Sequence, residues 1–221
     1  MLREKLANDI ASRVIVKRAS YTPNLDNLVH YNHAGDRPIT PSISRLHSTD
    51  PEQADKILAD LVARGHRKPN YMADRQAIED YMRSRLPDMG IVPGSEYPTY
   101  AVLDMGSDPK IFAGERKTVL PLQALKDKVT FTIGDSFPVL SHKIDPERKT
   151  PIGPYGRELL TYKAIKQLVN GGRLARRIER MHDVSLARGR KYPMDYVEAQ
   201  IWEDPEKLLD LINKGTTQSN G

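Results

Sequence analysis

Three acidic side chains lie where a carboxylate could take part in catalysis. Glu115 comes just before the segment 118–120, Asp135 follows the alternating segment 128–133 after one glycine, and Asp36 lies in a long early loop. A fixed carboxylate can stabilise positive charge that develops in a transition state. Glu115, Asp135 and Asp36 are therefore the candidate catalytic residues.

A second group of side chains could hold a ligand by hydrogen bonding or stacking. His47, Ser48 and Thr49 follow one another at the end of an expected strand, and Tyr71 lies in a second one. A tyrosine ring offers flat contact area at little entropic cost. Structural explanations are also open: His47 can be a satisfied polar residue, Tyr71 a core residue, and Glu115 part of a weak ion pair with its basic neighbours.

Composition and motifs exclude several other kinds of site. The chain has no cysteine, which rules out disulfides, thiolate zinc sites, iron–sulfur clusters and a cysteine nucleophile. His30 and His33 have a spacing compatible with a metal, but no third ligand stands out beside them, so no metal site is predicted. Walker A, GxGxxG and GxSxG motifs are missing from the sequence.

The elements that must position these residues are mixed in type over the first two thirds of the chain. Thr49 with Glu52 fits a capping box, and Asp50 before Pro51 is an alternative helix start. The full set of expected elements is a helix over 1–18, a loop over 21–42, strands at 43–47 and 70–72, each entering a helix, and strands at 99–105, 118–120 and 128–133. This order predicts the α+β class.

Beyond the loop 138–154 the pattern predicts helices only, over 159–169, 173–191, 194–203 and 205–213. We therefore expect two parts: a core with the N-terminal helix over 1–150 and a helical, target-recognising subdomain over 151–221. The formal charge of +5 is concentrated in the second part, because 173–191 holds seven basic and two acidic residues. Such a helix face could meet nucleic acid, an acidic protein surface or lipid headgroups, or simply face water.

The hydropathy of the 221 residues predicts a soluble protein. No run approaches the roughly 20 apolar residues of a membrane span, and the first 18 residues carry too many charges for a signal peptide. We expect a monomer with no membrane contact. Any secretion would need another kind of signal.

Four segments together resemble the ADP-ribosyltransferase superfamily over about residues 43–135. Leu46-His47-Ser48-Thr49 is similar to the first motif of the superfamily, Tyr71-Met72-Ala73-Asp74 to the second, and 100–105 to the core strand that follows. Gly114-Glu115-Arg116-Lys117-Thr118-Val119-Leu120-Pro121 resembles the glutamate-bearing strand, but Lys117 occupies the position expected for the catalytic glutamate. The resemblance implies a mixed β core that binds NAD as a co-substrate.

The resemblance also implies roles for individual residues. His47, Ser48 and Thr49 would contact a ribose of NAD, and Tyr71 would stack on nicotinamide. A carboxylate would assist the departure of nicotinamide through an oxocarbenium-like transition state. Glu115 can fill this place if the strand register is shifted, Asp135 or Asp36 can reach the same pocket, or the site only binds.

The function that follows from the resemblance is mono-ADP-ribosyl transfer, a glycosyltransferase reaction, from NAD to a protein side chain. The mixture of polymerase-like and toxin-like motifs is similar to bacterial effectors that modify ubiquitin on threonine and work inside a host cytoplasm. Two alternatives stay open. One is an NAD-dependent RNA 2′-phosphotransferase, and the other is a non-catalytic nucleic-acid-binding or adaptor protein that uses the basic helix 173–191.

Overall fold

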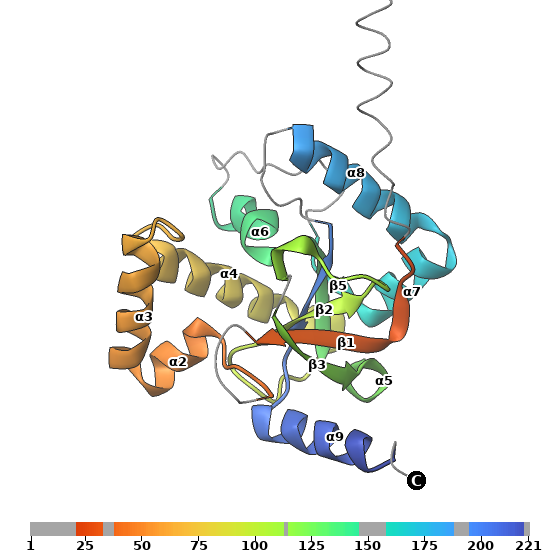
Figure 1. Ribbon diagram of the computed structural model, residues 1–221, viewed down its shortest axis with the longest axis horizontal. Helices are drawn as coiled ribbons and strands as arrows, with labels where there is room; N and C mark the ends of the chain where they lie inside the picture. The colour runs from red at the N-terminus through yellow and green to blue at the C-terminus, as the bar shows by residue number, and fades with distance from the viewer. Residues whose placement is uncertain (1–20, 33–37, 113–114, 146–157, 188–194, 219–221) are drawn as a thin grey trace, which may run out of the picture.

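The computed structural model contains one six-stranded antiparallel sheet surrounded by helices, which confirms the predicted α+β class (Figure 1). The structure describes residues 21–32, 38–112, 115–145, 158–187 and 195–218. The predicted helix 1–18, the candidates Asp36 and His33, and the basic residues Arg188, Arg190 and Lys191 lie outside these ranges. None of the described helices is both long enough and apolar enough to cross a membrane.

The sheet has the strand order β3-β1-β2-β6-β4-β5. Its strands are β1 (Asn24–Asn32), β2 (Thr99–Asp104), β3 (Arg116–Pro121), β4 (Val129–Ile133), β5 (Leu160–Thr161) and β6 (Val197–Ile201). Neighbouring strands are antiparallel throughout. The centre of the sheet thus joins β2 to β4 through β6, a strand from near the end of the chain.

The register separates the two faces of the sheet near β6. Ala101, Ala199 and Phe131 are in register across β2, β6 and β4, and all three are buried in the main core. The adjacent row contains Tyr100, Gln200 and Thr130, and the next contains Val102, Glu198 and Thr132. Because neighbouring residues of a strand alternate between faces, Ala199 belongs to the apolar face, whereas Glu198 and Gln200 share the more polar one.

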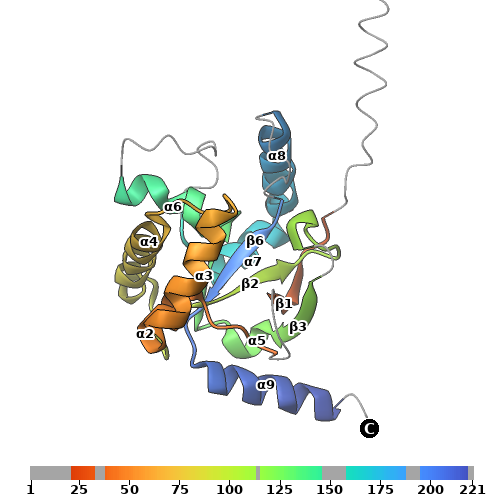
Figure 2. The same ribbon diagram turned by 60° about the vertical axis from the view of Figure 1, so that its left-hand side comes forward.

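Helices cover the sheet on both sides and at its ends (Figures 1 and 2). They are α2 (Ile43–Thr49), α3 (Pro51–Ala63), α4 (Tyr71–Arg85), α5 (Leu122–Leu125), α6 (Ser136–Ile144), α7 (Tyr162–Asn170), α8 (Arg173–Ala187) and α9 (Pro205–Gln218), with short 3-10 turns at Pro87–Met89 and Lys110–Phe112. Helix α4 packs against α6, α7 against α8, and α9 against β3.

Helix α3 begins at Pro51 with Asp50 as its N-cap, which is the alternative start predicted from the sequence. The Gln53 backbone N–H donates to the Asp50 side chain at 3.0 Å, and Pro51 is the first residue of α3. Thr49 ends α2 instead of capping α3, so the predicted capping box with Glu52 is wrong.

The predicted strands 43–47 and 70–72 are wrong, because 43–47 lies in α2 and Tyr71 and Met72 begin α4. Ser42 caps α2 by accepting a hydrogen bond from the Arg45 backbone N–H at 3.3 Å. Tyr71 is the first residue of α4, and with Arg75, Ile78 and Met82 it has a spacing of four, three and four residues. This spacing is that of one helix face, and Tyr71 belongs to the stripe that turns inward.

The predicted helix 194–203 is also wrong, because its centre forms β6. Val197, Ala199 and Ile201 are buried and alternate with Glu198 and Gln200, a period of two that fits a strand. The predicted helical subdomain 151–221 therefore contributes a central strand to the sheet and β5 to its edge. A further strand, β1, forms within the predicted loop 21–42.

Candidate functional site

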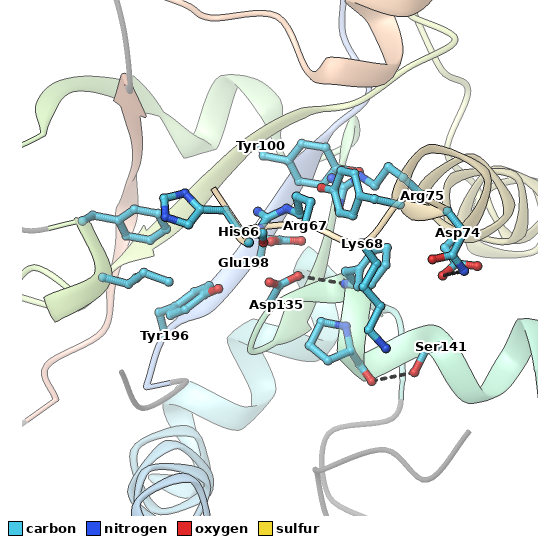
Figure 3. A pocket seen from close by; sticks show the side chains of 17 residues that line it. His66, Arg67, Lys68, Asp74, Arg75, Tyr100, Asp135, Ser141, Tyr196 and Glu198 are labelled. Carbon is cyan, nitrogen blue, oxygen red and sulfur yellow. Dashed lines mark hydrogen bonds between the residues drawn. The ribbon is translucent and has the colours of Figure 1, made fainter. Parts of the chain in front are cut away.

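Two adjacent cavities lie on the polar face of the sheet. The larger one, drawn in Figure 3, is lined by residues of α4, α6 and the sheet, and the smaller one by residues of α4, the sheet and the segment 40–43. Their volumes are about 1030 Å³ and 230 Å³. The residues that line both are Tyr71, Arg75, Tyr100, Phe112 and Glu198. Pockets for small molecules and cofactors usually measure about 300–1,000 Å³, so the larger cavity alone has room for a dinucleotide-sized ligand.

A pair of carboxylates projects into the larger cavity from two elements. Glu198 comes from β6, and Asp135 from the residue just before α6 (Figure 3). The Ser136 backbone N–H donates to Glu198 Oε1 at 3.1 Å, and the Phe137 backbone N–H donates to Asp135 Oδ1 at 2.9 Å. Asp135 therefore caps α6, and the start of this helix holds the two acidic groups next to each other.

The environment of Glu198 opposes its ionisation. Burial and the nearby negative charge of Asp135 raise the pKa of the Glu198 carboxyl to about 7, although Arg75 and the hydrogen bonds from Ser136 and Gln200 act in the opposite direction. Near neutral pH, Glu198 can therefore hold or release a proton. A carboxylate with this property can act as a general base or stabilise a developing positive charge.

Arg75 is a buried cation at the junction of the two cavities. Its Nε donates to Glu79 Oε1 at 2.9 Å, and its guanidinium carbon lies 4.0 Å from the centre of the Tyr100 ring. The Tyr100 hydroxyl donates to the same Glu79 oxygen at 2.7 Å. Glu79 is fully buried, so Arg75 is held in one position by an ion pair and a cation–π contact. The guanidinium remains positively charged in this setting.

Aromatic side chains form much of the remaining wall. Tyr71 and Phe137 have ring centres 5.1 Å apart, and Phe112 stacks on Tyr31 at 4.5 Å. Tyr196 meets the edge of Phe112 at 5.5 Å. These rings provide flat apolar surfaces close to charged groups.

The mouth of the larger cavity is basic. His66, Arg67 and Lys68 are exposed residues that line it (Figure 3). The Arg67 guanidinium carbon lies 4.8 Å from the centre of the Tyr71 ring. This rim would attract an anionic ligand, whereas the carboxylate pair deeper inside would attract positive charge.

Of the predicted site residues that lie in the described ranges, the structure brings together Tyr71 and Asp135. Tyr71 lines both cavities, and Asp135 lines the larger one. His47, Ser48 and Thr49 are on α2, away from the lining that the described residues form. The His47 imidazole lies 3.8 Å from Asp55, and the Thr49 hydroxyl donates to the Arg45 carbonyl at 3.1 Å.

Glu115 also lies away from both cavities as the described residues form them. It precedes β3, and its backbone N–H donates to the Phe112 carbonyl at 3.1 Å. Lys117, which occupies the position expected for the catalytic glutamate, forms an ion pair with Asp108. The carboxylate that faces the cavity from a strand is Glu198.

Sequence reasoning missed Glu198, Arg75, Tyr100 and Tyr196. The alternation of Tyr196, Glu198 and Gln200 with buried apolar residues is a strand pattern that could have placed Glu198 on one face of a strand. For Arg75, the spacing of four residues to Glu79 indicates a helical ion pair but not its burial.

No three of the acidic and histidine side chains in the described ranges gather in a group that could hold a metal ion. Comparisons with family models, with curated proteins and with solved structures found no match to this chain.

Proposed function

We propose that the protein is an ADP-ribosyltransferase, which cleaves the nicotinamide–ribose bond of NAD and transfers ADP-ribose to a protein side chain. The observation that carries the proposal is the Glu198–Asp135 pair, which faces a large cavity next to the fixed cation of Arg75. The proposal rests on the chemistry of this site, because the helical forms of 43–47 and 70–72 remove the element order on which the motif resemblance depended.

The charges of NAD match those of the site. Its nicotinamide ring is positive and bonded to a ribose, and its diphosphate is negative. The carboxylate pair suits the ring and ribose, while Arg75 and the basic rim suit the diphosphate. The aromatic wall suits both flat rings of the dinucleotide. We assign nicotinamide to the smaller cavity, where Tyr31 and Phe112 form an aromatic wall close to Glu198.

The proposed reaction needs one carboxylate that becomes ionised near neutral pH. The bond between ribose C1′ and the nicotinamide nitrogen breaks, and its electron pair leaves with nicotinamide, which becomes neutral. Ionised Glu198 stabilises the positive charge that develops at C1′. The acceptor side chain forms the new bond to C1′ with its lone pair and gives its proton to the carboxylate pair, from which the proton passes to water.

The acceptor in this proposal is a protein, with ubiquitin as one candidate, and a bacterial effector or toxin acting in a host cytoplasm would have such an activity. Exposed basic residues on α7 and α8 offer a surface for an acidic partner. They are Lys163, Lys166, Arg173, Arg176 and Arg180.

The experiment that tests the function uses NAD labelled in its adenylate part, incubated with the full chain and a cell lysate. We expect label on a discrete protein band, lost in Glu198→Gln. Glu115→Gln is the matched control, because it makes the same chemical change outside both cavities, and it should keep activity. Transfer that Glu115→Gln abolishes and Glu198→Gln does not would contradict the assigned site.

Two further outcomes would overturn the function itself. Consumption of NAD only with a 2′-phosphorylated RNA would identify an RNA 2′-phosphotransferase. Calorimetry that detects no NAD binding by the folded protein would remove both NAD-dependent activities.

A further inference from the structure

Gln200 is hydrogen-bonded to Glu198 and belongs to a chain of hydrogen bonds on the polar face of the sheet. It is fully buried on β6, two residues from Glu198. Its Nε2 donates to Glu198 Oε1 and to Thr132 Oγ1, each at 3.0 Å. Its Oε1 accepts from Thr130 Oγ1, also at 3.0 Å. A buried amide with all three contacts satisfied is held firmly.

The orientation of this amide is fixed from both ends. An indole N–H can only donate, and Trp202 Nε1 donates to Thr130 Oγ1 at 2.9 Å. The Thr130 hydroxyl hydrogen is then free to point to the Gln200 carbonyl oxygen. At the other end, Thr132 Oγ1 donates to the Gly134 carbonyl at 2.8 Å, so it must accept from Gln200. Both ends place the NH₂ group of Gln200 towards Glu198.

The two oxygens of Glu198 therefore have different surroundings. Oε1 accepts from the Ser136 backbone N–H at 3.1 Å and from Gln200 Nε2 at 3.0 Å. Two N–H donors leave little room for a proton on Oε1. In the described part of the chain no donor reaches Oε2. This oxygen is also not among the buried atoms that lack a hydrogen-bond partner.

We propose that Gln200 is a positioning residue, which holds Glu198 with Oε1 turned to the protein and Oε2 turned to the ribose carbon of the substrate. Oε2 is then the oxygen that stabilises the charge at C1′ and takes the acceptor proton. The proposal deepens the proposed function and rests on it for the identity of the substrate. The hydrogen-bond geometry itself is independent of NAD.

Other charged or titratable groups also face Glu198 and must stay constant in the test. They are Asp135 before α6, Arg75 on α4, Tyr100 on β2 and Tyr196 before β6. Substitutions at Gln200 and Thr130 leave all four in place. A change in the Glu198 pKa in these variants can therefore be assigned to the hydrogen bond from the Gln200 amide.

The test is a pH titration of the full chain with ¹³C-labelled glutamate, followed by NMR without NAD, and Glu198→Gln identifies the Glu198 signal. Gln200→Met removes the donor and should raise the Glu198 pKa by about one pH unit, because a hydrogen bond to a charged group favours that form. Thr130→Val removes the donor to the Gln200 carbonyl oxygen. One of the two groups that fix the amide is then lost, so its hydrogen bond to Glu198 weakens and the Glu198 pKa should also rise. Thr130→Ser keeps the hydroxyl and should leave the pKa unchanged.

NAD kinetics then separate positioning from general damage. Gln200→Met and Thr130→Val should lower kcat for nicotinamide release by about tenfold or more with little change in KM, because a small misplacement of the carboxylate affects the transition state most. If Gln200→Met does not fold, Thr130→Val against Thr130→Ser carries the test alone.

The positioning role is overturned if the Glu198 pKa is the same in wild type, Gln200→Met and Thr130→Val, or if Thr130→Ser shifts it as much as Thr130→Val. If the Glu198 pKa is raised in both variants but the wild-type protein does not cleave NAD, the positioning role of Gln200 is supported and the proposed function is wrong. Failure of the two ideas is thus distinguishable.

Discussion

Glu198 is held where ionisation costs folding free energy. Its carboxyl has a pKa of about 7 in the folded protein against an ordinary value of 4.5, mainly because of burial and secondly because of Asp135. Between these two values the folded state keeps a proton that the unfolded chain has lost. Stability must therefore fall as pH rises from about 4.5 to 7, and the full cost is present above pH 7.

This cost gives a prediction for Glu198→Gln. The glutamine is neutral at every pH and can still accept from the Ser136 backbone N–H. We expect the variant to be more stable than wild type by about 1–3 kcal/mol at pH 8 and equally stable at pH 4. Urea unfolding at the two pH values measures the difference. A variant that is less stable at pH 8 would contradict the environment assigned to Glu198.

Asp135 gives a second prediction at the same scale. Asp135→Asn removes the neighbouring negative charge but retains a side-chain oxygen that can cap α6. The midpoint of the pH–rate profile for nicotinamide release should move down from about 7, by roughly one pH unit. An unchanged midpoint with intact activity would show that Asp135 has no electrostatic influence on Glu198.

At the scale of elements, the position of β6 decides whether the site exists. Without β6 between β2 and β4, Glu198 would not face α4 and α6. Because the chain has no cysteine, engineered disulfides can test this register directly. Ala101 and Ala199 face each other across β2 and β6, at a Cα separation of about 4.5–5.5 Å expected for antiparallel partners, which a disulfide can bridge.

We therefore expect Ala101→Cys with Ala199→Cys to form an intramolecular disulfide during oxidative refolding, as detected by mass spectrometry of peptides. The matched control is Ala101→Cys with Gln200→Cys, whose side chains project to opposite faces of the sheet and should stay reduced. Equal cross-linking of the two pairs would be incompatible with the register.

Elements with a strong local pattern could be predicted from the sequence, but β6, whose type depends on its partner strands, could not. The start of α3 at Pro51 and the strands around Val102 and Phe131 follow from local caps and periodicity. β6 carries two polar residues in its centre, so its short pattern is ambiguous without the partners that bury it. Pairing with β2 and β4 makes this segment a strand.

The candidate site was predictable only in part for the same reason. Asp135 was found because it lies at the end of a predicted strand. Tyr71 was predicted as a residue of the strand 70–72, but it is the first residue of α4. Glu198 and Arg75 become functional candidates only when the fold brings β6 and α4, more than one hundred positions apart in the sequence, to the same cavity. His47 and Glu115 have suitable chemistry, but their elements lead them away from the cavity.

At the scale of the whole molecule, the proposed catalytic and acceptor-binding surfaces are on different elements. Arg173 and Arg176 are exposed on α8 and do not line either cavity. We expect Arg173→Glu with Arg176→Glu to lower transfer to an acidic acceptor protein by about tenfold, because long-range attraction is lost. Nicotinamide release without acceptor should stay unchanged. Equal losses in both assays would rule out a separate acceptor surface.

The central claim is that Glu198, in its ionised form, assists the cleavage of NAD in this cavity. The most direct measurement is the rate of nicotinamide release from NAD by the full chain as a function of pH, in wild type and in Glu198→Gln. We predict a rate that rises to a plateau with a midpoint near pH 7 and falls by about 100-fold or more in the variant. Release no faster than in buffer, or a rate that folded Glu198→Gln retains, would contradict the claim.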